Sequence, residues 1–207
     1  MQVFTRQIRL LGGAEAAGWA MEVTGKAREA SGLPISLWTG AVGLPVGSYA
    51  WSAPVEGLAQ LSAGTEKMNA DAALTALVAQ GREFIADVQP DRLMQLVHGE
   101  IAGPAEVGSF MGSVSAVAVN GQGAAAGEWA VKIAETAKGV TGLPVVVLST
   151  VSGPMFEFGW FVRYATAADF DTANAKIMGS ESYAAEVASG SGLFQPGATQ
   201  VVAQRIA

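Results

Sequence analysis

The sequence contains no cysteine and a single histidine, His98. Disulfide bonds, thiolate catalysis and cysteine-bound metals are therefore excluded. Zinc and copper sites usually need several histidine or cysteine ligands, so we expect no metal site of that kind, and no cofactor. Any catalysis by a histidine, or any haem ligation by one, would have to use His98.

Charged residues are also scarce. They make up 14% of the chain, whereas about a quarter is usual for soluble proteins. With a net charge of −6 the chain lacks the basic face that binds nucleic-acid phosphates. No apolar run reaches the roughly eighteen residues of a membrane span, and the N-terminal residues do not resemble a secretory signal. We therefore expect a cytoplasmic protein that binds neither nucleic acid nor membrane.

What the sequence does contain is a repeat. Gly-Leu-Pro occurs at residues 32–34 and again at 142–144, and Trp19 and Trp129 are separated by the same 110 positions. Each tryptophan begins a run in which apolar residues recur every three or four positions, which is typical of an amphipathic helix. The glycine then suits a left-handed helix end, and the proline prevents the helix from continuing. The motif therefore predicts a helix end followed by a strand.

The same order of elements is predicted in each half of the chain. A first strand, the helix, a two-stranded hairpin, further helical runs and a closing strand follow one another twice. This order indicates an α+β fold of two tandem ferredoxin-like βαββαβ units. We expect a first repeat at residues 1–98, a linker at 99–109 and a second repeat at 110–207. Each sheet would have one uncovered face, so the two antiparallel sheets are expected to pack face to face as a pseudo-dimeric α/β barrel.

Two passages resemble a known superfamily: YAWSAPVEGLAQL at residues 49–61 and YATAADFDTANAKIMGSESYAAEV at residues 164–187. They are similar to the strand and helical segments of the dimeric α/β-barrel superfamily, which includes antibiotic-biosynthesis monooxygenase-like, EthD-like and NIPSNAP-like proteins. In such proteins two chains usually build the barrel. The resemblance implies that this chain would build it alone. It also implies, for cofactor-free monooxygenases, an Asn, Trp and Tyr or His set near a cavity, for which Asn120, Trp38, Trp51 and Trp160 are candidates.

Alternation along the strands predicts which side chains face the barrel interior. In the strand at 155–164 the apolar set suits the helix-covered face, which leaves Glu157, Phe161 and Arg163 for the interior. In the first half, the interior set includes Gln7, Arg9, Ser48 and Ser52. We expect one interior pocket in which an acid, a guanidinium and an aromatic wall receive a small organic molecule. The alternative is a structural Glu157–Arg163 ion pair, or both groups in water at strand ends.

His98 closes the strand DRLMQLVH, where alternation places it on one face with Met94 and Leu96. In several enzymes of the resembled superfamily a histidine assists catalysis or binds haem iron, which makes His98 a catalytic candidate together with Glu157 and Arg163. The alternative is an ordinary histidine at a strand end, because no partner group is recognisable in the sequence.

Three functions remain open. The first is a cofactor-independent monooxygenase, cyclase or isomerase that acts on a hydrophobic or aromatic molecule inside the barrel. The second is a non-catalytic ligand-binding or assembly protein, and the third is a haem-handling protein that uses His98. The expected partner is a small molecule, and a homo-oligomer would form through surfaces outside the barrel.

Overall fold

The computed structural model describes residues 1–101 and 103–207. The elements of the first half are β1 (Gln2–Leu10), α1 (Gly13–Ser31), β2 (Ser36–Val42), β3 (Ser48–Val55), α2 (Leu58–Ala70), α3 (Ala72–Gln80), the 3₁₀ turn η1 (Gly81–Glu83), β4 (Ile85–Val88) and β5 (Arg92–His98). Those of the second half are β6 (Phe110–Val117), α4 (Gly123–Thr141), β7 (Val145–Ser152), β8 (Glu157–Tyr164), α5 (Ala167–Met178), α6 (Glu181–Ser189) and β9 (Thr199–Arg205).

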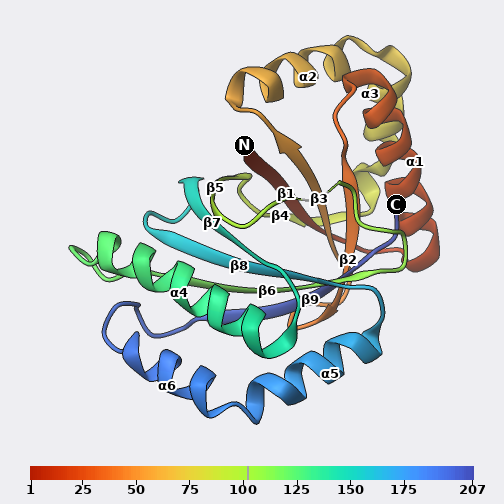
Figure 1. Cartoon of the computed structure of the whole chain (residues 1–207). Coiled ribbons are helices and arrows are strands. Elements are labelled where there is room, and N and C mark those ends of the chain that lie inside the picture. The colour runs from red at the N-terminus through yellow and green to blue at the C-terminus, as the bar shows by residue number, and fades with distance from the viewer. Residues whose placement is uncertain (102) are drawn as a thin grey trace.

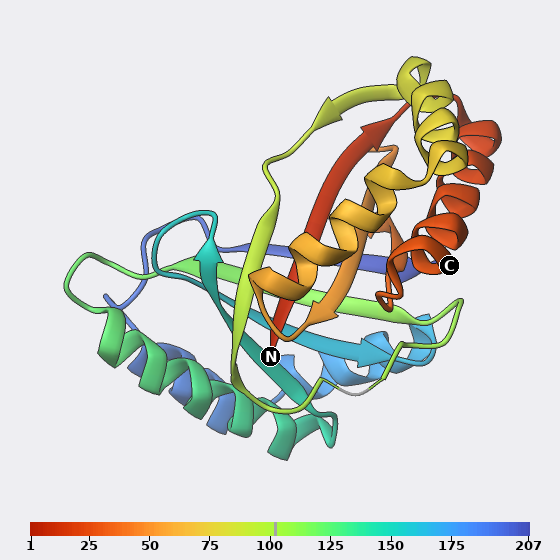
Figure 2. The same cartoon turned by 90° about the horizontal axis from the view of Figure 1, so that it is seen from above.

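Eight of these strands close into an antiparallel barrel, as the sequence predicts. The order around the wall is β3-β2-β9-β6-β8-β7-β5-β1, and β1 pairs again with β3 to complete the circle. The two halves therefore meet along two seams, β2 with β9 and β5 with β7. Figures 1 and 2 show helices α1–α3 on one side of the barrel and α4–α6 on the opposite side.

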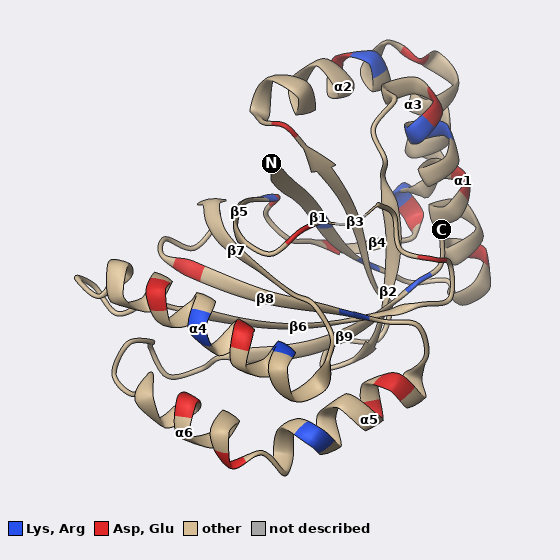
Figure 3. Ribbon diagram, viewed as in Figure 1, with Lys and Arg blue, Asp and Glu red and all other residues tan. Residues whose placement is uncertain are grey.

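Alternation along the strands separates an outer, helix-covered face from the barrel interior. On β1, Ile8 and Leu10 belong to a core cluster under α1 and α3. On β8, Phe158 lies in the core under α4, and Trp160 and Val162 pack against that core. The outer faces of both halves are therefore apolar. Figure 3 shows that the charged residues lie mainly on the helices and near strand ends.

Equivalent contacts recur in the two halves. Gly32 and Gly142 both end their helices in the left-handed conformation, with φ of 73° and 79°. The indole nitrogen of Trp19 donates to the Leu77 carbonyl at 2.8 Å, and that of Trp129 donates to the Glu186 carbonyl at 2.9 Å. The Gly-Leu-Pro motif thus has the structural role that the sequence predicts.

The structure differs from the sequence expectation after α3. The apolar run at residues 71–85 predicts one helix, but α3 ends at Gln80, and β4 then pairs with the end of β1. Pro54, which suits the first turn of a helix, instead lies in β3 opposite Val3. No helix in the described part of the chain is long and apolar enough to cross a membrane.

Candidate functional site

An apolar cavity of about 370 Å³ lies in the second half of the chain, between the outer face of the sheet and helices α4, α5 and α6. Its lining includes Gly112, Ala116, Trp129, Ile133, Ala134, Val145, Trp160, Tyr164, Phe170, Ala173, Asn174, Tyr183, Val187, Phe194, Ala198 and Gln200. The sequence pattern predicts a ligand in the barrel interior, whereas this cavity lies on the helix-covered face of the sheet.

The cavity exists because strand β6 carries smaller residues than its counterpart β1. Trp51 of β3 and Trp160 of β8 occupy equivalent positions in the two halves. Phe4 pairs with the residue two positions after Trp51, and Gly112 pairs with the residue two positions after Trp160. Gly112 therefore occupies the place of Phe4. By the same register, Ala116 occupies the place of Ile8. The ring of Tyr164 lies 3.1 Å from the position of an added Cβ on Gly112, so the volume that is left open is the one beside Ala116. The first half fills this space with its own core, and the second half leaves it open.

Aromatic rings form one wall of the cavity. Trp129 and Trp160 meet edge to face with centroids 5.9 Å apart, and Phe194 lies 5.3 Å from Trp129. The indole nitrogen of Trp160 donates to the Ala130 carbonyl at 2.9 Å, and that of Trp129 is also bonded. With these polar groups satisfied, the tryptophans present apolar ring surface to the cavity.

Two half-buried tyrosines, Tyr164 and Tyr183, contribute hydroxyl groups to the lining of the cavity. Tyr164 comes from the end of β8, Tyr183 from α6, and Tyr164 stacks edge to face on Phe170 at 5.3 Å. Burial raises the pKa of both hydroxyls, and the neighbouring Tyr183 raises that of Tyr164 further. Within residues 1–101 and 103–207 neither hydroxyl has a hydrogen-bond partner. Both are therefore protonated at neutral pH and can donate to a ligand oxygen.

Among the described residues that line the cavity there is no Asp, Glu, Lys, Arg or His. An ion in an apolar site costs a large desolvation free energy unless it is paired. The lining therefore favours uncharged ligands. It also contains no nitrogen or sulfur side chain that commonly ligates haem, and a tyrosine ligand would need a lowered rather than a raised pKa.

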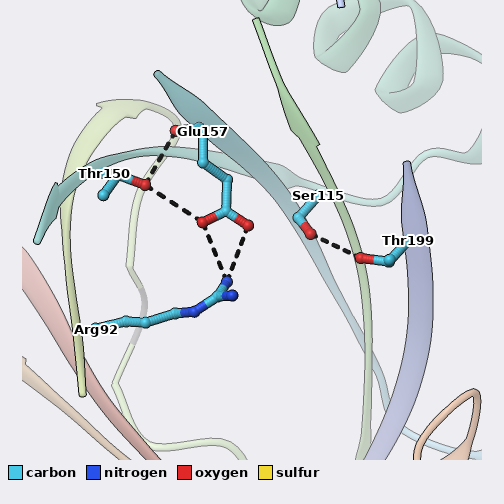
Figure 4. A network of polar contacts seen from close by, with 5 residues as sticks. All are labelled: Arg92, Ser115, Thr150, Glu157 and Thr199. Carbon is cyan, nitrogen blue, oxygen red and sulfur yellow. Dashed lines mark hydrogen bonds and ion pairs between the residues drawn. The ribbon is translucent and has the colours of Figure 1, made fainter. Parts of the chain in front are cut away.

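The structure does not bring Glu157 and Arg163 together, because they lie near opposite ends of β8. Glu157 is buried and accepts hydrogen bonds from Nη1 of Arg92 at 2.9 and 3.1 Å. Thr150 lies beside this pair, and Ser115 bonds Thr199 nearby (Figure 4). Arg163 donates to the Gly103 carbonyl at 2.5 Å, and burial lowers its pKa. The partner of Glu157 is thus Arg92 of β5, which the sequence does not single out.

The remaining interior candidates have separate surroundings. Gln7, Arg9 and Ser48 line a second, more polar hollow of about 470 Å³, to which β4 contributes Asp87. Ser52 accepts a hydrogen bond from the indole nitrogen of buried Trp38 at 2.8 Å. Phe161 packs closely over Gly159. These side chains do not form one pocket with Glu157 and Arg163.

His98 lies outside the apolar cavity. The pairing of β5 with β7 shifts between Leu96 and His98, so that His98 lies opposite Val147, whose side chain is in the core under α4. The expectation that His98 shares a face with Met94 and Leu96 is therefore wrong, because a β-bulge reverses the alternation. Its Nε2 lies 2.6 Å from Oε1 of Glu135, and this hydrogen bond is the main cause of the lowered pKa of Glu135.

The asparagine of the cavity is Asn174 on α5, and Asn120 is an exposed turn residue beyond β6. The sequence signal that could have found it is the passage at 164–187, which contains Asn174 between Tyr164 and Tyr183. No group of three or more potential metal ligands occurs in the described part of the chain.

No family model matches the sequence, and no curated protein matches it. Several solved structures share its fold. A candidate monooxygenase from Fusobacterium nucleatum matches with a TM-score of 0.72 at 8% identity, covering 100% of this chain and 92% of its own. A candidate monooxygenase from Lactobacillus acidophilus gives a TM-score of 0.66 at 11% identity, covering 99% and 93%.

A third match, an anthrone oxidase-like protein, has a TM-score of 0.67 at 11% identity and covers 100% of this chain and 91% of its own. Likeness at such low identity establishes the fold and leaves the activity open. The chain therefore has the dimeric α/β-barrel fold of ferredoxin-like units, with both units in one polypeptide.

Proposed function

We propose that the chain binds an uncharged, aromatic small molecule in the cavity between the second-half sheet and helices α4–α6. The observation that carries this proposal is the combination of an aromatic wall with two half-buried tyrosines whose hydroxyls donate to no group of the described residues. The volume of about 370 Å³ lies in the range of small-molecule pockets, roughly 300–1,000 Å³. A ligand oxygen that displaces water from these hydroxyls would accept their hydrogen bonds.

The enzymatic form of the proposal is a cofactor-independent oxygenation. Two structural neighbours are candidate monooxygenases and a third is an anthrone oxidase-like protein. The resemblance of the sequence implies an Asn, Trp and Tyr or His set near a cavity, and Asn174, Trp160 and Tyr164 line this one. A methylene that is flanked by aromatic rings and activated through them by a carbonyl group, as in anthrone, can be oxidised by O₂ to a ketone, with one oxygen atom entering the product and the other leaving as water.

In such a reaction the residues of this chain would hold the substrate and its developing charge. Tyr164 and Tyr183 would donate hydrogen bonds to the substrate oxygen when the methylene loses a proton and an enolate forms. The cavity offers no carboxylate or imidazole as a base, so the proton would leave to water at the open side. The lack of a base equally suits the second candidate, a protein that binds such a molecule without changing it.

The test fills the cavity with the residue of the other half. Ala116→Ile restores the side chain of Ile8 at the equivalent position, and we expect at least a tenfold loss of affinity for 2-naphthol, measured by quenching of tryptophan fluorescence. Unchanged or improved thermal stability of the variant would show that the fold is intact. Equal affinity of the variant and the natural chain would overturn the proposal.

A second experiment separates the enzyme from the binding protein. It measures whether the natural chain, without any added cofactor, consumes oxygen in the presence of anthrone.

A further inference from the structure

The apolar cavity is open to solvent along one side. Its floor is closed, because Ile133, Ala134, Val145 and Ala173 are buried, with exposed fractions between 2% and 6%. Four further lining residues, which we call the rim, are exposed: Asn174 on α5, Val187 on α6, Ala198 just before β9 and Gln200 in β9. A ligand held on the floor would therefore have one end at the protein surface.

Half of the rim is polar. Asn174 and Gln200 each carry a side-chain amide, and in the described part of the chain neither amide makes a hydrogen bond to protein. Each can both donate and accept. The two residues come from different elements, α5 and β9. The residues that line the rim include no charged side chain.

The cavity is thus apolar at its floor and partly polar at its rim, as the two ends of an amphipathic molecule would require. From this distribution of polar groups we propose that the natural ligand has an aromatic ring system on the floor and an uncharged, hydroxyl-rich substituent, such as a sugar, at the rim. This inference rests on the proposed function and adds the class of the ligand. A wholly apolar ligand would leave ring surface in water at the exposed rim, whereas hydroxyl groups there meet both water and the amides.

The experiment compares 2-naphthol with 2-naphthyl β-D-glucoside. The two compounds have the same ring system, and only the second carries a sugar. For the natural chain we expect the glucoside to bind at least as tightly as 2-naphthol by isothermal titration calorimetry. In Asn174→Ala and Gln200→Ala we expect the glucoside to bind threefold to tenfold more weakly. Binding of 2-naphthol should be unchanged in Gln200→Ala, and thermal denaturation shows whether both variants are folded.

The outcomes separate this inference from the proposed function. Failure of the natural chain to bind 2-naphthol would contradict the proposed function itself. Binding of 2-naphthol with a glucoside affinity more than tenfold weaker would overturn the inference alone. The inference would also fall if both alanine variants bound the glucoside as the natural chain does, because the amides would then contribute nothing to recognition.

Discussion

At the scale of single residues, Glu157 and Arg92 form an unequal ion pair. The side chain of Glu157 is 5% exposed and that of Arg92 is 44% exposed. Removing the arginine leaves a buried carboxylate without its main donor, whereas removing the carboxylate leaves a guanidinium that water can reach. Removal of either side chain is therefore expected to lower the free energy of unfolding by a different amount.

We accordingly expect Arg92→Met to lower the free energy of unfolding by about 1–3 kcal/mol and Glu157→Gln by about 1 kcal/mol or less. Urea denaturation at pH 7 measures both values. The double variant should be more stable than Arg92→Met alone, because it no longer buries an unpaired charge. A larger loss in Glu157→Gln than in Arg92→Met would contradict this account.

A second prediction at this scale concerns Glu186, which accepts hydrogen bonds from Lys132 and Ser189. Both bonds lower the pKa of Glu186 from the ordinary value of 4.5, and the bond from Lys132 has the larger effect. The folded protein thus binds this proton less readily than the unfolded chain. The stabilisation is complete above the ordinary pKa and is lost as the pH falls through the lowered pKa. We expect Glu186→Gln to reduce the loss of stability between neutral pH and pH 3 in urea denaturation. An unchanged pH dependence would rule this contribution out.

Single residues were the hardest part to predict from the sequence. Alternation assigns Glu157 to the inner face of β8, but it cannot identify a partner 65 positions away in the chain. His98 shows a second reason, because one bulge residue reverses which face a strand end presents. Asn174 lies on an exposed helical turn, and only the cavity beside it gives it significance.

At the scale of elements, a glycine allows each tryptophan to pack against the end of its short helix. A Cβ on Gly190 would lie 2.4 Å from the Trp129 ring, and one on Gly81 would lie 2.0 Å from the Trp19 ring. Neither glycine has a positive φ, so the constraint is the space and not the backbone conformation. The close approach fixes where α3 and α6 end.

Gly190→Ala should therefore destabilise the protein by about 1–3 kcal/mol through overpacking. The matched control is Gly25→Ala in the middle of α1, where a Cβ would meet nothing within 4 Å. That change should stabilise the protein by about 0.5–1 kcal/mol, because alanine favours a helix interior more than glycine does. Thermal and urea denaturation of both variants check the difference in sign.

Elements were more predictable than residues where two independent signals agreed. The ends of α1 and α4 combine apolar periodicity with a glycine and a proline, and both helices end at the expected glycine. The run after Asp71 carries periodicity alone. It predicts a helix to Ile85, and the 3₁₀ turn that begins at Gly81 divides this run before β4.

At the scale of the whole molecule, the barrel could be predicted because the same order of elements occurs in both halves and each sheet has one apolar face that must be buried. The cavity could not be predicted, because it depends on the summed side-chain volumes of β6, β8 and three helices. We propose that residues 1–98 and 110–207 are the two repeats. Since both seams join one half to the other, neither half should be a folded monomer alone.

We expect each half, expressed alone, to aggregate or form a homodimer, and the two halves, expressed together, to form a one-to-one complex. Size-exclusion chromatography and native mass spectrometry distinguish these species. A folded, monomeric first half would show that the seams are not needed for its stability.

The closed wall also limits how copies of this chain can meet. A strand whose backbone is paired on both sides cannot accept another strand, and eight of the nine described strands lie in the closed wall. β4 alone has one free side. It has only four residues, includes Asp87 and is followed by Pro90, features that oppose strand addition. Fibril formation through exposed sheet edges is therefore disfavoured by the topology itself, whatever the cavity binds.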